Sequence, residues 1–289
     1  MRFVILSRSR FLYTTRRLIA EAKLRRHDVR VASPLECSLV ITAGQPRLLF
    51  KGKLPSSAEV VIPRLTPEDW QHGMTVLRAL ERMGVPILNS ADALEQTRDR
   101  FLGAMALAGL ALPVPPTALV PNAVELASAV EALGGLPLQL RPVHQSVGRP
   151  VLLDSRATLE AVTAMAWQHG TQFILQRVQG AARELRLYVA GEEFLGAVLR
   201  RPQWANAAGI KPGATVECPE ALRKLAQRAC TGTGLLVASV DVIETHAGPL
   251  LVEIDGMPNL RGIDKPTREA VATAMIKRAE GLGVSRIPV

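Results

Sequence analysis

The segment VEIDGMPNLRGID, residues 252–264, constrains this chain most strongly. An apolar run ends there with two carboxylates, Glu253 and Asp255, directly before a turn rich in Gly, Pro and Asn. Side chains alternate along a strand, so these two acids share one face. A preceding strand-like run, ASVDVIET, carries Asp241. The pattern predicts two neighbouring strands with acids on one face.

Two interpretations of these acids stay open from their spacing. Three oxygen-bearing side chains on neighbouring strands suit Mg²⁺ or Mn²⁺, which prefer oxygen ligands. A hairpin with one face in water also alternates acidic and apolar residues, without any metal. Converging carboxylates repel one another unless a cation or basic residues lie between them. Relief of that repulsion predicts that Glu253→Gln leaves the fold intact.

The composition is that of a globular protein with two or three lobes. The chain has 289 residues, 48% of them hydrophobic and 21% charged. No apolar run approaches the length of a membrane span, and FVIL is followed too soon by Arg8 and Arg10 for a secretory signal. Cys37, Cys218 and Cys230 show no CxxC spacing. They predict a reducing, cytoplasmic location rather than a disulfide framework.

The net charge of +9 has two explanations, solvated basic faces or attraction to acidic ligands such as ATP and glutamate. The sequence has no block of five Lys or Arg residues, and aromatic residues make up only 4%. A stacking platform interleaved with basic residues is therefore missing, which argues against a dedicated nucleic-acid binder.

Strand and helix patterns divide the chain into three lobes of an α/β protein with α+β lobes. Residues 1–93 alternate strands with helices at 14–26 and 72–83, which predicts a Rossmann-like parallel sheet ending in a strand at 85–88. Residues 94–170 form a central lobe. Residues 171–289 form a last lobe, with the strands FILQRV, ELRLYVA and EEFLGAVLRR and helices at 219–233 and 265–280.

The closing segment VDVIETHAGPLLVEIDGMPNLRGID resembles that of ATP-grasp ligases. Four earlier segments resemble RimK, the ribosomal-protein glutamate ligase. They are MRFVILSRSRFLYTTRRL, FKGKLP, VVIPRL and PILNS, and the similarity runs along the whole chain. The resemblance implies an ATP-grasp fold behind the Rossmann-like lobe. It also implies ATP and Mg²⁺ or Mn²⁺ as cofactors.

The resemblance carries site residues onto this chain. It implies nucleotide binding by Arg100, Arg141, Ser146, Gly148, Gln176, Arg177, Val178 and Glu184. It implies substrate contact and phosphoryl stabilisation by Arg186, Arg200, Arg201 and Asn206. It implies metal binding by Asp241, Glu253 and Asp255, with Asp255 in place of the usual Asn.

Three features depart from the family pattern. Arg100 and Arg141 stand where the family has lysines, and arginine is bulkier than lysine although it keeps the charge. The phosphate loop HQSVGRPV, residues 144–151, keeps one glycine, and Pro150 removes an N–H group. Trp204 stands where the family has an arginine. These departures bear on turnover and on substrate choice.

Two functions follow from the resemblance. The first is a carboxylate–amine ligase that joins an acidic amino acid such as glutamate to an amine or a protein C-terminus. It would act through an acyl phosphate and release ADP and phosphate. The alternative is a degenerate ATP-grasp protein that acts as a nucleotide-binding or regulatory module. A membrane partner is not expected, and a homo-oligomer is compatible with either function.

Overall fold

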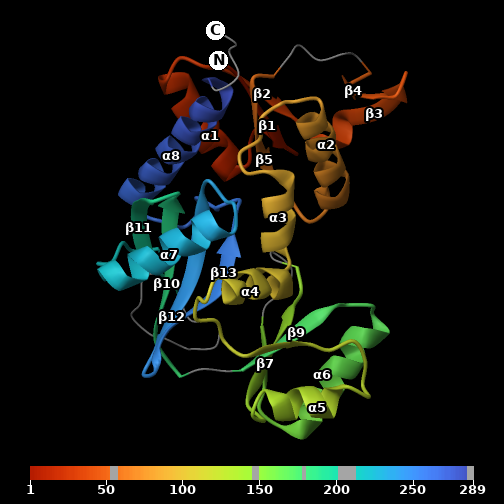
Figure 1. Cartoon of the computed structure of the whole chain (residues 1–289), viewed down its shortest axis with the longest axis vertical. Coiled ribbons are helices and arrows are strands. Elements are labelled where there is room, and N and C mark those ends of the chain that lie inside the picture. Colours follow the sequence, from red (N-terminus) through yellow and green to blue (C-terminus); the bar gives the residue numbers. More distant parts are fainter. Residues whose placement is uncertain (53–57, 145–149, 178–179, 201–212, 285–289) are drawn as a thin grey trace.

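Three lobes follow one another in the computed structural model, which describes residues 1–52, 58–144, 150–177, 180–200 and 213–284 (Figure 1). The N-terminal lobe and both chain ends lie at one end of the long axis, and the central lobe lies at the other. The last lobe lies between them in the view. Among the described residues, no helix is long and apolar enough to cross a membrane.

The N-terminal lobe contains the predicted parallel sheet. Strand β1 (Arg2–Ser7) lies between β2 (Asp28–Ala32) and β5 (Val60–Arg64). Alternate residues of β1 face opposite layers, so Ile5 packs in one core with helices α1 (Tyr13–Leu24) and α8 (Lys265–Val284). Leu6 packs in the other core with α2 (Trp70–Arg82). The last helix of the chain thus covers the first sheet.

Two details of this lobe differ from the sequence expectation. The run at 85–88 is not a strand, because only Ile87 forms a bridge, to Val61. An unpredicted antiparallel hairpin, β3 (Cys37–Thr42) and β4 (Gln45–Phe50), follows the short helix η1 (Pro34–Glu36). Its two-residue turn holds Ala43 and Gly44 at φ of 50° and 75°. That is the positive-φ pair that a tight hairpin turn requires.

Helices α3 (Ala91–Arg98) and α4 (Arg100–Gly109) lead into the central lobe. Its antiparallel sheet has the order β6-β9-β7-β8. The strands are β6 (Thr117–Leu119), β7 (Leu138–Pro142), β8 (Val151–Leu153) and β9 (Phe173–Arg177). The expectation placed FILQRV in the last lobe. Pairing of β9 with both β6 and β7 moves it into the central lobe.

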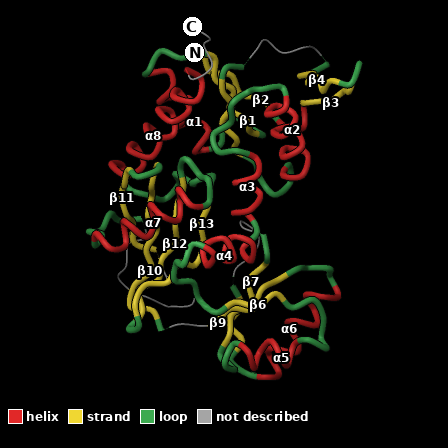
Figure 2. Tube along the Cα trace, in the orientation of Figure 1, coloured by secondary structure: helices red, strands yellow, loops and turns green. Residues whose placement is uncertain are grey.

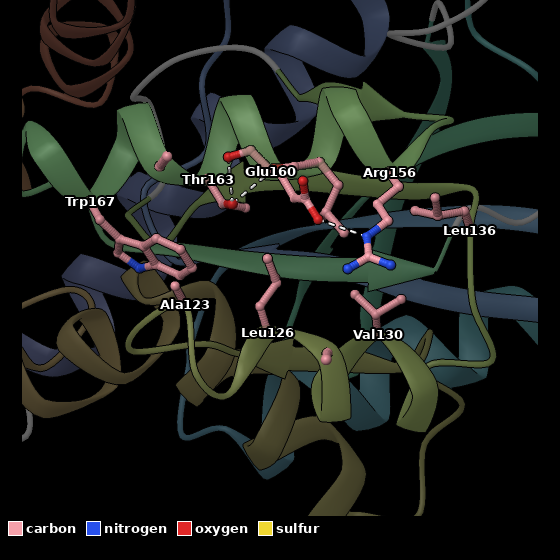
Figure 3. Close-up of a pocket in the computed structure, with 11 residues that line it drawn as sticks. Ala123, Leu126, Val130, Leu136, Arg156, Glu160, Thr163 and Trp167 are labelled. Atoms are coloured by element: carbon pink, nitrogen blue, oxygen red, sulfur yellow. Dashed lines mark hydrogen bonds and ion pairs between the residues drawn. The ribbon is translucent and has the colours of Figure 1, made fainter.

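Two helices cover this sheet, α5 (Leu126–Ala132) and α6 (Arg156–Gln168). Figure 3 shows the groove between them, which has a volume of about 600 Å³ and apolar walls that include Leu126, Val130 and Trp167. The Arg156 guanidinium donates to Glu160 across one turn of α6, at 2.7 Å. The groove lies on the helical layer of the lobe.

The last lobe has a four-stranded antiparallel sheet of order β11-β10-β12-β13. Its strands are β10 (Ala181–Ala190), β11 (Glu193–Arg200), β12 (Ala238–Thr245) and β13 (Gly248–Asp255). Helix α7 (Glu220–Gly232) packs its Leu222, Ala226 and Ala229 against Leu185 and Leu187 of β10. The tube view shows α7 lying across these strands (Figure 2). Its packing commits one sheet face to this core. On the other face, Tyr188 and Val198 pack in a core with residues of α8, and charged residues occupy the remainder.

Asn89 joins the first lobe to the last. Its side chain is buried, donates to the carbonyls of Val237 and Gly256 at 2.8 and 2.7 Å, and accepts from the amides of Leu236 and Val237 at 2.6 and 3.2 Å. One amide side chain therefore forms hydrogen bonds to four backbone groups at the junction.

Candidate functional site

Charged residues line the face of the last sheet that lies opposite α7. Strand register pairs Glu184 with Arg200, Arg186 with Asp241, and Asp241 with Glu253. Directly paired residues point to the same side of a sheet, so these five side chains share one face. The register therefore supports the expectation that Asp241 and Glu253 are neighbours on one face.

Two arginines neutralise Asp241. The Arg186 guanidinium donates to both carboxylate oxygens, from Nε at 2.7 Å and from Nη2 at 2.8 Å, and Arg200 donates to Oδ2. The Asp241 side chain is only 3% exposed. Burial alone would raise its pKa, but Arg186 and Arg200 outweigh burial and hold the pKa lowered to about 2. Asp241 is an anion clamped between two cations.

Glu253 is held by two arginines, Arg100 and Arg141. Its Oε2 accepts from Arg141 Nη2 at 2.6 Å and from Arg100 Nε at 3.2 Å. Both guanidinium side chains are buried, at 10% and 6% exposure for Arg100 and Arg141. Arg100 also donates to the carbonyls of Pro142 and His144, at 2.6 and 2.8 Å. The start of α4, the end of β7 and β13 therefore meet at one carboxylate.

The three predicted metal ligands do not form a metal-ready cluster. Among the described residues, no group of three or more His, Cys, Asp or Glu side chains lies close enough to hold an ion. Guanidinium groups occupy Asp241 and Glu253, and Asp255 accepts from the Met257 amide at 2.8 Å beside a different cavity. The expectation that the three carboxylates share one or two hard cations therefore stays a prediction. The donor chemistry alone still suits a hard cation.

The proposed nucleotide side of the site lies between the central and last sheets. Gln176 accepts from Arg141 Nη1 at 3.2 Å and donates to the Thr117 hydroxyl at 3.0 Å. Arg177 instead donates to the Leu133 carbonyl, at 3.3 Å. The described residues leave a cavity of about 20 Å³ here, lined by Arg141, Gln176 and Glu184 among others. That volume holds about one water.

Five predicted site residues fall outside the described residues. They are Ser146, Gly148, Val178, Arg201 and Asn206.

Glu184 carries an unsatisfied oxygen at the centre of this cleft. The residue is 5% exposed, its Oε1 lies 3.2 Å from Arg200 Nη1, and its Oε2 has no hydrogen-bond partner among the described residues. Burial raises the pKa of Glu184 from its ordinary 4.5 to about 7, against the lowering effect of Arg200. A buried acceptor without a donor is a place where a ligand hydroxyl or N–H gains a bond.

This environment predicts a pH dependence of stability. The folded pKa of Glu184 lies above the unfolded pKa, so the folded state binds the proton more strongly. The contribution of Glu184 to the free energy of unfolding is fully present below about pH 4.5. It is lost as pH rises through about 7, and the loss is roughly 3 kcal/mol. Urea unfolding across this range should show the decline in the wild type and a flatter profile in Glu184→Gln. Equal slopes in both proteins would contradict the assignment.

A second polar cavity was missed by sequence reasoning. It lies between the first and last lobes and includes Arg64, Trp70, Arg98 and Asp255 in its wall. The available signals were Arg64 at the end of the apolar run VVIP and Arg98 beside Asp99 at the end of α3. Neither signal indicates which residues meet, because they are separated by more than thirty positions along the chain.

Comparisons with known proteins agree with this architecture. The RimK PreATP-grasp domain family matches residues 1–94, and the RimK-like ATP-grasp domain family matches residues 97–279. A probable alpha-L-glutamate ligase of Stenotrophomonas maltophilia is 31% identical over 98% of this chain and 99% of its own length. One from Legionella pneumophila is 30% identical over 97% of this chain and 95% of its own length.

Solved structures share the fold at lower identity. An ATP-grasp RimK domain protein from Sphaerobacter thermophilus superposes with a TM-score of 0.73 at 21% identity, covering 95% of this chain and 98% of its own. The ATP-grasp ligase PsnB, complexed with a minimal precursor, Mg and ADP, superposes with a TM-score of 0.70 at 14% identity. That match covers 96% of this chain and 98% of PsnB. These similarities support an ATP-grasp arrangement of the lobes.

Proposed function

Because the chain belongs to the RimK-like ATP-grasp family, we propose that it is an ADP-forming carboxylate–amine ligase. Its proposed substrates are an acidic amino acid such as glutamate and an amine or protein acceptor. The observation that carries the proposal is the meeting of Arg100 and Arg141 at Glu253, between the two antiparallel sheets. Four arginines of the central and last lobes lie at this face with three acids of the last lobe. The arginines are Arg100, Arg141, Arg186 and Arg200, and the acids are Glu184, Asp241 and Glu253. Such a cluster of guanidinium groups suits the binding of a polyphosphate.

The proposed reaction has two steps. A carboxylate oxygen of one substrate attacks the γ-phosphorus of ATP, and ADP leaves with the electron pair of the broken P–O bond. The amine nitrogen of the second substrate then attacks the acyl carbon, phosphate leaves, and the amine loses a proton. Positioning and charge neutralisation supply most of the catalysis in such transfers.

Residues of this chain divide these tasks. We assign the phosphates to Arg100 and Arg141, whose fork of N–H groups matches phosphate oxygens. Arg186 and Arg200 lie beside Asp241 at the same face and would stabilise charge that develops during transfer. Gln176 and Glu184 face the cleft on the proposed adenosine side.

A divalent cation fits this proposal through its ligand chemistry. Asp241 and Glu253 would hold Mg²⁺ through carboxylate oxygens, with Asp255 two residues further along β13. When bound, such a cation neutralises phosphate oxygens. The arginines offset the charges of Asp241 and Glu253, which reduces the repulsion between these two neighbouring acids.

The decisive experiment is ADP formation by the purified chain. ATP, Mg²⁺, acidic amino acids and amine or peptide acceptors are combined in a panel, with ADP and the amide product measured. We expect ADP only when both substrates and Mg²⁺ are present. ADP formation independent of the acceptor would contradict ligation.

A second candidate is a nucleotide-binding module without turnover. The observation that favours it is the pairing of Asp241 and Glu253 with arginines, which offsets the charge that would attract a metal. In that case ATP would raise the melting temperature, since a ligand that binds only the folded state stabilises it. ADP would remain unformed in every combination of the panel.

A further inference from the structure

The second cavity, between the first and last lobes, has the chemistry of an anion site. Its volume is about 280 Å³, close to the lower limit of roughly 300 Å³ for small-molecule sites. The end of β5, the start of α2, the end of α3 and the end of β13 surround it. The carboxyl ends of parallel strands are where open α/β sheets bind ligands, and β5 ends here.

Arg98 is the unusual member of the wall. Its guanidinium lies over the Trp70 ring, 3.9 Å from the centroid, and its Nε is buried without a hydrogen-bond partner among the described residues. The salt bridges of the described part of the chain do not include Arg98. A buried donor on a cation is costly unless an acceptor reaches it. The stack on Trp70 holds the planar group in place without using its N–H donors.

The remaining charges leave the cavity short of acceptors. Arg64 donates one N–H to the Pro258 carbonyl at 3.1 Å, which leaves its other donors unassigned. Asp255 is the carboxylate in the wall, and its Oδ1 already accepts from the Met257 amide. Asp69 is a second acid that interacts electrostatically with Arg98. Its Oδ1 accepts from the Thr66 amide at 2.6 Å, and its Oδ2 has no hydrogen-bond partner among the described residues. Neither Arg64 nor Arg98 therefore forms an ion pair with Asp255 or Asp69 among the described residues.

We propose that this cavity binds the side-chain carboxylate of the amine substrate, with Arg98 and Arg64 as its donors. The proposal rests on the ligase function and names the acidic class of that substrate. Arginine offers paired N–H groups that match a carboxylate, and the ring of Trp70 gives the bound molecule an apolar wall. Asp255 lies two residues from Glu253, or about 7 Å along the strand. A molecule anchored here therefore reaches the proposed phosphate site with its other end.

The carboxylate has two sources, free glutamate or a peptide that begins with glutamate. Isothermal titration measures the binding of both ligands to the wild type, Arg98→Ala, Arg98→Lys and the surface control Arg156→Ala. L-glutamine, which differs from glutamate only by lacking the side-chain carboxylate, is the probe for that group. Side-chain exposure of 88% makes Arg156 a control for loss of one positive charge. We expect Arg98→Ala to weaken the preferred carboxylate ligand about tenfold or more, and Arg98→Lys to recover only part of the loss. ATP affinity and the Arg156→Ala control should stay at the wild-type level.

Each outcome decides the proposal. Three results would overturn it. The first is that Arg98→Ala binds both ligands within about twofold of the wild-type affinity. The others are that the wild type binds neither ligand, or that it binds glutamine and glutamate equally. The steady-state assay separates this failure from failure of the ligase function. ADP formation with an unchanged KM for the acidic substrate in Arg98→Ala rejects the cavity alone. Carboxylate binding without ADP formation rejects the ligase function alone.

Discussion

Glu253→Gln should lower ADP formation by about a hundredfold or more and also destabilise the fold. The substitution keeps the shape of the side chain but removes the charge that Arg100 and Arg141 share, at 3.2 and 2.6 Å. Two buried guanidinium groups then lose their counter-ion. Removing one partner of a buried ion pair costs roughly 3–5 kcal/mol of stability. The amide oxygen of the new side chain still accepts a hydrogen bond from an arginine, so we expect a cost near the lower end of that range. Urea unfolding and the ADP assay measure the two effects.

Matched variants identify the cause of this loss. Glu160→Gln removes a carboxylate from the exposed Arg156 pair on α6 and should cost at most about 1 kcal/mol. Adding Arg141→Met to Glu253→Gln removes one unpaired cation and should restore part of the stability while activity stays lost. Unchanged stability of Glu253→Gln would mean that the arginines do not depend on this carboxylate.

Asn89→Ala should have the largest effect on stability outside the charged site. It strips partners from four backbone groups, the carbonyls of Val237 and Gly256 and the amides of Leu236 and Val237. Each buried group left without a partner costs roughly 1–3 kcal/mol, so a total of at least about 3 kcal/mol is expected. Chemical denaturation of the variant measures the loss.

Asn122→Ala is the matched control for this prediction. Asn122 accepts from the amides of Val124 and Glu125, at 2.9 and 3.2 Å, in an exposed turn where water replaces the lost bonds. Its removal should cost about 1 kcal/mol. If both variants lose the same stability, the junction at Asn89 is not the tie between lobes that its four bonds indicate.

Local patterns predicted most elements, because alternation and helical periodicity are set within a few residues. The sheet of β1, β2 and β5 and the long helices α2 and α7 follow the expected runs. The missed β3–β4 hairpin also carried a local signal, an Ala-Gly turn between alternating runs. Assignment of β9 to the wrong lobe had another cause. An apolar strand such as FILQR indicates burial but not which sheet it joins.

Tertiary contacts reverse the expected effect of Glu253→Gln on stability. From the sequence, Asp241, Glu253 and Asp255 are mutually repelling acids, and removal of one charge relieves repulsion. In the fold, Arg186 and Arg200 approach Asp241, and Arg100 and Arg141 approach Glu253. The same substitution therefore exposes cations and destabilises the protein.

The sequence by itself determined the ATP-grasp family, the strands of the acidic face and the sharing of one face by Asp241 and Glu253. These follow from local period and from motifs that stay close along the chain. Only the tertiary structure decided which cations meet which acids and that Arg98 stacks on Trp70 beside Asp255. Those contacts join residues separated by up to about 150 positions, and packing of the lobes brings them together where no local rule applies.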